Sequence, residues 1–403
     1  MVKNNNSFLL MPSFYGLITF SIFYILYRVN FLNFYTPSAT SQIIFTLVIA
    51  CFCLSTLINR KRYNKLNFSG DKILIVPNKL KFILYVFYFI GYLGFLKYLF
   101  DMISALGGIA KFFLILQSES NLIRNTIEDI ASGSIQMTYF GWFAIWLTFY
   151  LIRIKKLSPK WYYHIVLTFI LNLLFIDRTR PVWLLVVLLL IMLVTLNVKK
   201  INFFKFVAYG LFVAVFFVAM FNQIGNWVGK KNEDFKYGQT ALPTFLQNAV
   251  FYCTSSYGYF DQVLKNENIS EFSPDRTAYP LAKLSKSLSF RDQDVVAQIN
   301  DFYDIPYSTN VGTFLEPFYR DGSYLYLIFG IIFYSFAFDY IGYLLLKSMS
   351  VFNHILWANL VFVNIIGFFT PKIGSTSIWL FVFIAIIFAK FVNKRRIHIE
   401  IKS

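Results

Sequence analysis

Charged residues interrupt two apolar runs at residues 177–180, where Asp177, Arg178, Thr179 and Arg180 precede Pro181. Charges between membrane spans are unfavourable unless they meet water, each other or a charged ligand. Pro181 disfavours helix at Arg180 and can open the next helix, which predicts a tight hairpin at the membrane boundary. Arginine forks match phosphate with two parallel hydrogen bonds. The alternative is that Asp177 pairs with one arginine while the other extends to lipid phosphate.

Further arginines fall in segments expected on the same side of the membrane. Any one of them is more typical of a solvated surface residue, because exposed charges usually contribute little. Together they predict a basic pocket, which would concentrate an anionic headgroup and hold a pyrophosphate without metal. These residues are Arg124, Arg276, Arg291 and Arg320, with Lys230 and Lys231 after the seventh apolar run.

Carboxylates are the available proton acceptors on this side, because His164, His354 and His398 map to cytoplasmic ends or the tail. A carboxylate can take a proton from a sugar hydroxyl while the anomeric carbon gains positive character. The alternative for each is an ion pair with a neighbouring arginine, and the sequence leaves the choice open. The candidates are Asp275, Glu316, Asp321, Asp261, Asp301 and Asp304.

Composition excludes several classes of protein. Of the 403 residues, 57% are hydrophobic and 14% charged, against roughly 25% charged in a soluble domain. The net charge of +17 is spread between apolar runs, which excludes a disordered chain and a nucleic-acid binder. Cys51, Cys53 and Cys253 form neither a disulfide framework nor a zinc site. Without metal-ligand spacings or a glycine-rich phosphate loop, we expect no metal and no cofactor.

Ten apolar runs are long enough to cross a bilayer, since a spanning helix needs about 20 residues. The sequence therefore predicts an all-α, polytopic membrane protein with residues 1–403 in a single integral membrane domain. The runs cover residues 8–28, 40–58, 80–100, 135–152, 161–177, 181–198, 203–222, 323–346, 353–370 and 374–392.

Lysine and arginine concentrate in alternate connections, at residues 60–81, 153–160 and 199–205, and in the tail from residue 390. Short positively charged loops stay in the cytoplasm, so we expect both termini there. Asp339 in the eighth run is expected to make a polar contact between helices.

One long extracytoplasmic segment, residues 223–322, separates the seventh and eighth runs. It holds nine Lys+Arg and twelve Asp+Glu, a net of −3, and long segments translocate regardless of charge. Its eight tyrosines and its apolar stretches at residues 241–251 and 279–288 predict a folded cap with short helices lying on the membrane.

Four motifs in order give the chain a resemblance to a known family. They are Gly107-Gly108 with Arg124 downstream, residues 176–181 (IDRTRP), residues 252–261 (YCTSSYGYFD) and residues 310–319 (NVGTFLEPFY). From about residue 80 onward the chain resembles Wzy-type oligosaccharide repeat-unit polymerases, the O-antigen and capsule polymerase family. Many relatives have a Gly-Ser-Arg type of turn where this chain has Asp-Arg-Thr-Arg, so either Arg178 or Arg180 matches the family's arginine.

The resemblance implies a C-type membrane glycosyltransferase-like fold in the bacterial inner membrane. Such enzymes move a growing glycan from one undecaprenyl-pyrophosphate carrier onto the next repeat unit, building lipopolysaccharide O-antigen or capsule. The implied partners are polyprenyl-pyrophosphate-linked oligosaccharides, membrane lipid, a chain-length regulator and a flippase. The residues expected to act in catalysis are Arg178, Arg180, Asp275 and Glu316, and those expected to bind pyrophosphate are Arg124, Arg178, Arg180, Arg276, Arg291 and Arg320.

Two other functions are compatible with this topology. One is a ligase that attaches finished glycan to a lipid core; such ligases typically use an outer-face histidine, and the predicted topology offers none. The other is a flippase or transporter of lipid-linked oligosaccharide. Transporters often have matching halves with broken helices near the bilayer middle, and the sequence shows neither halves nor repeats.

Overall fold

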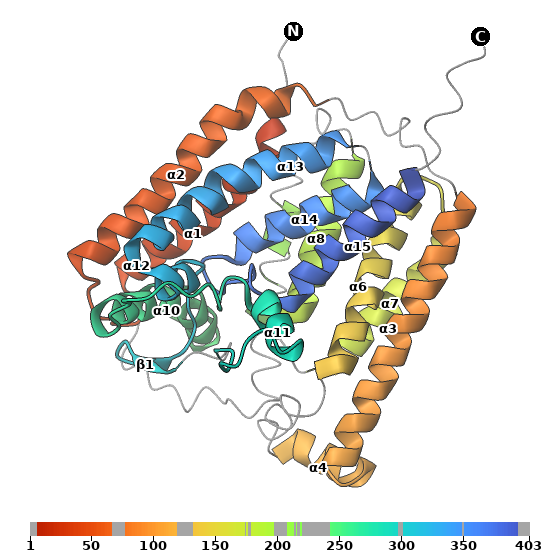
Figure 1. Ribbon diagram of the computed structural model, residues 1–403, viewed down its shortest axis with the longest axis horizontal. Coiled ribbons are helices and arrows are strands. Elements are labelled where there is room, and N and C mark those ends of the chain that lie inside the picture. Colours follow the sequence, from red (N-terminus) through yellow and green to blue (C-terminus); the bar gives the residue numbers. More distant parts are fainter. Residues whose placement is uncertain are drawn as a thin grey trace. The chain divides into compact units, whose positions relative to one another are not determined.

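The computed structural model describes residues 6–66, 77–118, 132–173, 175, 179–196, 208–212, 215, 218–219, 242–296, 301–348 and 350–393 (Figure 1). This part of the chain is mostly helical. Its one sheet pairs β1 (Tyr303–Asp304) with β2 (Ser308–Thr309), antiparallel. Among the described residues, four helices are long and apolar enough to cross a membrane: Ala39–Asn64, Asn78–Ala105, Gly133–Arg153 and Leu315–Lys347.

Helices occupy most of the predicted spans, and shorter apolar helices at Thr179–Thr195, Val351–Ile366 and Thr376–Ala389 fall on three of them. The predicted span at residues 203–222 lies largely outside the described residues. The number of crossings therefore stays a prediction.

The chain divides into two compact units, and the single integral membrane domain stays a prediction. Unit 1 contains residues 1–66, 235–347 and 359–379, and unit 2 contains residues 67–234, 348–358 and 380–403. Most of the predicted cap, residues 223–322, belongs to unit 1 together with the helices near the N-terminus.

Unit 1 is built from helices and the small sheet. Its described elements are η1 (Asn6–Leu10), α1 (Pro12–Val29), α2 (Ala39–Asn64), α10 (Thr244–Asn266), α11 (Tyr279–Ser287), β1, β2, α12 (Leu315–Ile332), the π-helix η5 (Phe333–Ala337) and α13 (Phe338–Lys347). It also takes the end of α14 (Val351–Ile366) and the start of α15 (Thr376–Asn393).

Asp339 joins three helices of unit 1. Its carboxylate accepts hydrogen bonds from the Ser13 amide at 2.8 Å and hydroxyl at 2.6 Å on α1, and from the Ser55 hydroxyl on α2 at 2.7 Å. Tyr63 on α2 donates to the Asp339 main-chain oxygen at 2.7 Å. The predicted polar contact between helices is confirmed, and it ties α13 to α1 and α2.

Helix α10 differs from the predicted short surface helix at residues 241–251. It runs for 23 residues, and Tyr257, Phe260 and Val263 are fully buried. The Tyr257 hydroxyl donates to the Phe20 carbonyl of α1 at 2.8 Å, and the Tyr257 ring packs edge-on against that of Phe45 on α2. Its aromatic side chains therefore draw α10 into the core, because covering such large rings removes much apolar area from water.

Helix α12 changes character at a kink. Gly322 and Ser323 leave helical geometry, and Ser323 has a φ of 58°. Before the kink the helix carries buried polar residues, including Glu316 and Asp321; after it, apolar side chains such as Leu325 are exposed. The kink therefore separates a polar, protein-packed turn from an apolar segment suited to lipid.

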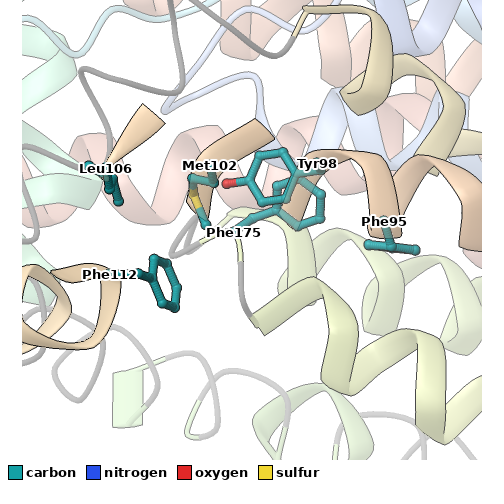
Figure 2. Close-up of a cluster of buried hydrophobic side chains, with 6 residues drawn as sticks. All are labelled: Phe95, Tyr98, Met102, Leu106, Phe112 and Phe175. Carbon is teal, nitrogen blue, oxygen red and sulfur yellow. The ribbon is translucent and has the colours of Figure 1, made fainter. Parts of the chain in front are cut away.

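Unit 2 contains its own set of helices. The described ones are α3 (Pro77–Ala105), α4 (Ile109–Ser118), α6 (Ser132–Arg153), η3 (Pro159–Trp161), α7 (Tyr162–Leu173) and α8 (Thr179–Thr195), with the start of α14 and most of α15. One hydrophobic cluster joins α3 and α4 to Phe175, which lies two residues after the end of α7 (Figure 2). It consists of Phe95, Tyr98, Met102, Leu106, Phe112 and Phe175.

Glycines allow α3 and α6 to approach closely. A Cβ at Gly91 would lie 2.6 Å from the Cα of Gly141, and one at Gly94 would lie 2.8 Å from the Thr138 amide nitrogen. Small residues permit such backbone contact between membrane helices.

We expect Gly91→Ala to lower the stability of unit 2 by about 1–3 kcal/mol, because the new methyl group meets backbone that cannot yield. Gly133→Ala on α6 is the matched control, since nothing lies within 4 Å of its added Cβ. Thermal unfolding of both variants in the same detergent measures the difference. Equal midpoints would contradict the close approach of α3 and α6.

Candidate functional site

The residues proposed from sequence fall in different places. Arg124 and Arg178 lie outside the described residues. Arg180 belongs to unit 2, and the others belong to unit 1. In unit 1 these residues, with two carboxylates beside them, form what we call the charged cluster: Glu267, Asp275, Arg276, Arg291, Glu316, Arg320 and Asp321.

Arg320 is the most buried arginine of the cluster, with its side chain 4% exposed. Its Nε donates to Glu267 Oε2 at 2.7 Å and its Nη2 donates to Glu267 Oε1. Its Nη1 donates to Glu316 Oε1 at 2.7 Å, one helical turn away on α12. Two carboxylates thus surround one guanidinium, which satisfies a buried charge that would otherwise be strongly unfavourable.

Two tyrosines complete this arrangement. Tyr303 donates to Glu267 Oε1 at 3.0 Å, and Arg320 Nη2 donates to the Tyr259 hydroxyl at 3.2 Å. Burial raises the pKa of both phenols, and the Glu267 carboxylate raises the pKa of Tyr303 further. Both tyrosines therefore stay protonated at neutral pH, as neutral hydrogen-bonding groups.

Glu316 is held from several sides and is almost fully buried. Besides its bond to Arg320, its Oε1 lies 3.9 Å from Arg276 Nη1. A Cβ at Gly312 would lie 2.3 Å from Glu316 Oε2, so a glycine there leaves room for the carboxylate. Its position between Arg320 and Arg276 fits a residue that holds these arginines in place.

Asp275 is paired with Arg291 across the two ends of α11. Arg291 Nη2 donates to Asp275 Oδ2 at 2.6 Å and Nη1 donates to Oδ1, the two-pronged geometry that suits guanidinium and carboxylate. The Asp275 hydrogen bond raises the pKa of Arg291. The Arg276 and Arg291 side chains are each 23% exposed, so these two arginines can reach a ligand.

Asp321 fixes the chain that carries Asp275 and Arg276. Its carboxylate accepts from the Arg276 amide at 3.1 Å, the Thr277 amide at 2.8 Å and the Thr277 hydroxyl at 2.7 Å. Its main-chain oxygen accepts from the Ser273 amide at 2.8 Å. Asp321 therefore has a structural role and is not offered to a substrate.

A loop between α14 and α15 also contacts this segment. A Cβ at Gly374 would lie 2.1 Å from the Arg276 carbonyl oxygen, so the backbones touch. The Ser375 amide and hydroxyl both donate to the Lys372 carbonyl, at 3.0 and 2.7 Å. This turn fixes the backbone of Lys372 two residues from the contact with Arg276.

The charge of the cluster is close to balanced. Three arginines against four carboxylates leave a net of −1 when all are ionised. The expected basic pocket would need further cations beyond these seven residues, so it stays a prediction. Each arginine already has a carboxylate partner, and an anionic ligand would have to compete for it.

Arg180 lies among aromatic rings in unit 2. Its guanidinium carbon is 4.2 Å from the ring centroid of Phe175, 5.6 Å from that of Tyr139 and 5.7 Å from that of Trp142. Such rings attract a cation through their negative faces.

The structure corrects the expected helix boundary, since α8 begins at Thr179 and includes Arg180. Pro181 is tolerated in the first turn because amides there lack an intrahelical partner.

The remaining candidate carboxylates have other surroundings. Asp301 and Asp304 are exposed, and the Asp301 carbonyl accepts from Tyr259 at 3.1 Å. Asp261 is buried and accepts from the Ser38 amide and hydroxyl and from the Ser41 hydroxyl, with Lys265 Nζ at 2.5 Å. It therefore ties α10 to the start of α2.

Sequence reasoning missed Glu267, Tyr259, Tyr303 and the turn at Lys372. Glu267 follows the last residue of α10 and has no arginine next to it in sequence, so no local pattern marked it. The tyrosines gave only a weak signal through the aromatic richness of the segment.

Within the described residues, no group of three or more His, Cys, Asp or Glu side chains could hold a metal ion.

Comparisons of the chain with family models, curated proteins and solved structures gave no match.

The stability of unit 1 should depend on pH through Asp261. Burial raises the pKa of Asp261, but hydrogen bonds from Lys265, Ser38 and Ser41 outweigh it, so the pKa lies below its ordinary value. A lowered folded-state pKa contributes stability above the unfolded value of about 3.9, and this is lost as the pH falls through the folded value.

We expect Asp261→Asn to lower the free energy of unfolding by about 2 kcal/mol at neutral pH. The deficit should shrink as the pH falls below the unfolded value of about 3.9 toward the lower pKa of folded Asp261. Unfolding in detergent at several pH values tests this, with Asp304→Asn as the control because Asp304 is exposed. A deficit that does not change with pH would contradict an ionised Asp261.

Proposed function

We propose that the protein is a membrane glycosyltransferase that polymerises polyprenyl-pyrophosphate-linked oligosaccharide repeat units at the outer face of the bacterial inner membrane. The observation that supports this is the convergence of Arg276, Arg291 and Arg320 with carboxylates in one charged cluster. Arginines can stabilise a departing diphosphate, and a carboxylate can accept the proton of the attacking hydroxyl. The product is O-antigen or capsular polysaccharide.

Arg276 and Arg291 bind the donor diphosphate in this proposal. Their side chains are partly exposed, whereas that of Arg320 is buried between Glu267 and Glu316. Arg320 is therefore a positioning residue. Through Glu316 it helps hold the guanidinium of Arg276 in place.

Asp275 is the proposed base, and donor binding activates it. In the structure Arg291 donates to both carboxylate oxygens, so it must leave before an acceptor hydroxyl can donate to Asp275 in its place. A diphosphate offers Arg291 a matching two-pronged partner. When Arg291 turns to the diphosphate, Asp275 becomes available to the acceptor hydroxyl.

The transfer step balances without a further reactant. The acceptor hydroxyl oxygen forms a bond to the anomeric carbon of the donor sugar as the bond from that carbon to the diphosphate oxygen breaks. The bonding electrons leave with the polyprenyl diphosphate, and the hydroxyl proton passes to Asp275. Arg276 and Arg291 stabilise the negative charge that develops on the diphosphate.

Purified protein incubated with a polyprenyl-pyrophosphate repeat unit, without metal or nucleotide, tests the proposed function. We expect longer lipid-linked glycans, resolved as a ladder by electrophoresis. Transfer only onto a lipid core would identify a ligase instead. Translocation in vesicles without any longer product would identify a transporter.

Asp275→Asn should lower kcat by about 100-fold or more, because the amide cannot accept the proton. KM for the donor should stay the same or fall, since Arg291 no longer has a competing carboxylate. Arg291→Lys should mainly raise KM, because an ammonium group lacks the two-pronged geometry. Asp292→Asn is the matched control, an exposed carboxylate beside Arg291. A parallel loss in Asp292→Asn, or full activity of Asp275→Asn, would remove Asp275 from the mechanism.

Arg178 and Arg180 are tested separately by Ala and Lys substitutions in cells. If either binds pyrophosphate, the Ala variant should shorten the glycan ladder at normal protein level, and Lys should restore only part of it. Unchanged ladders in all four variants would show that neither residue takes part.

A further inference from the structure

Helix α11 carries an apolar face that unit 1 leaves uncovered. Leu281, Leu284 and Leu288 are 50%, 54% and 55% exposed, and their spacing places them on one side of the helix. Lys283 and Lys286 are exposed on the opposite side, and Lys286 pairs with Asp294. The helix, labelled α11 in Figure 1, is therefore amphipathic and has exposed side chains on both faces.

The segments flanking α11 add two exposed aromatic rings to these three exposed leucines. Phe290 follows the helix and is 81% exposed, and Phe272 precedes it and is 64% exposed. Five large apolar side chains exposed within 19 residues exceed what isolated surface residues need to explain.

The start of α11 is fixed next to the apolar part of α12. Asp321 binds the Arg276 and Thr277 amides, immediately before the helix. The Phe272 ring packs edge-on against that of Tyr326, just past the kink, with centroids 5.1 Å apart. After the kink at Gly322 and Ser323, the α12 side chains Leu325, Ile328 and Phe329 are exposed. These apolar side chains suit lipid, so α11 begins where the lipid-facing surface of α12 begins.

We propose that α11 lies in the interfacial region of the bilayer, with Leu281, Leu284 and Leu288 among the acyl chains and its lysines at anionic lipid headgroups. An apolar face opposite a lysine-bearing face is typical of helices that lie in a membrane surface. The continuity with the exposed part of α12 favours lipid as the occupant. This inference does not depend on the proposed glycosyltransferase function.

The placement also has a consequence for the charged cluster. Asp275 and Arg276 lie just before α11 and Arg291 lies just after it. A helix held flat at the headgroups would keep both partly exposed arginines at the depth where lipid-linked phosphate resides.

Site-directed fluorescence tests the proposal on the full-length protein. With Cys51, Cys53 and Cys253 replaced, a single cysteine is introduced at Leu284, at Leu288 or, as the control on the opposite face, at Lys283. Each is labelled with an environment-sensitive dye and reconstituted in nanodiscs of phosphatidylcholine with phosphatidylglycerol. Quenching by lipids spin-labelled on the upper acyl chain and by aqueous iodide is then measured.

We expect dyes at Leu284 and Leu288 to be quenched by the spin-labelled lipid about twofold more than the dye at Lys283, and iodide to show the reverse order. Equal lipid quenching on both faces, or stronger iodide quenching on the leucine face, would overturn the proposal. Low quenching by both agents, with disulfide-linked dimers through Leu288→Cys, would also overturn it by identifying a second copy as the occupant. Unchanged elution of the labelled proteins on size exclusion confirms that they are folded.

Discussion

The burial of Arg320 constrains the whole charged cluster. A guanidinium with its side chain 4% exposed cannot lose its charge, so carboxylates must reach it from the protein. Glu316 comes from the preceding turn of α12, and Glu267 comes from the end of α10, 53 residues earlier. Removing one partner from such a buried set leaves an uncompensated charge, which is strongly unfavourable. Ion pairs therefore connect the end of α10 to the start of α12.

Adjacent residues on α12 organise different parts of unit 1. Arg320 donates to Glu267, which follows α10. Asp321 accepts three hydrogen bonds from Arg276 and Thr277. The kink at Gly322 and Ser323 follows at once, and the helix then turns apolar. Phe272 packs so near Gly322 that an added Cβ would lie 2.8 Å from its ring. One short stretch thus sets both the position of the ion pairs and the level at which the lipid-facing surface starts.

The sequence predicted the helices better than it predicted the site. Apolar runs mark helices reliably because each must satisfy its own backbone in lipid, and Asp339 stood out because a carboxylate inside such a run needs partners. Helix α10 was misjudged as a surface element, because its tyrosines read equally well as an interface or as a core. Glu267 could not be found, since its role arises from a contact 53 residues along the chain. Asp275 pairs with Arg291 rather than with adjacent Arg276. This pairing likewise could not be found, because it depends on the segments before and after α11 approaching each other.

The near balance of charge in the cluster bears on how an anion could be bound there. An open patch of cations would bind any phosphate, lipid headgroups included, and would hold it when no reaction is needed. Here the partly exposed guanidinium of Arg291 is occupied by Asp275, and that of Arg276 lies 3.9 Å from Glu316. A ligand must therefore replace these contacts with equally good ones, and a diphosphate with several oxygens does so better than a single phosphodiester. Under the proposed function, internal pairing would in this way favour the lipid-linked diphosphate over the surrounding phospholipid. It would also leave the carboxylate of Asp275 unoccupied only after the donor has been bound.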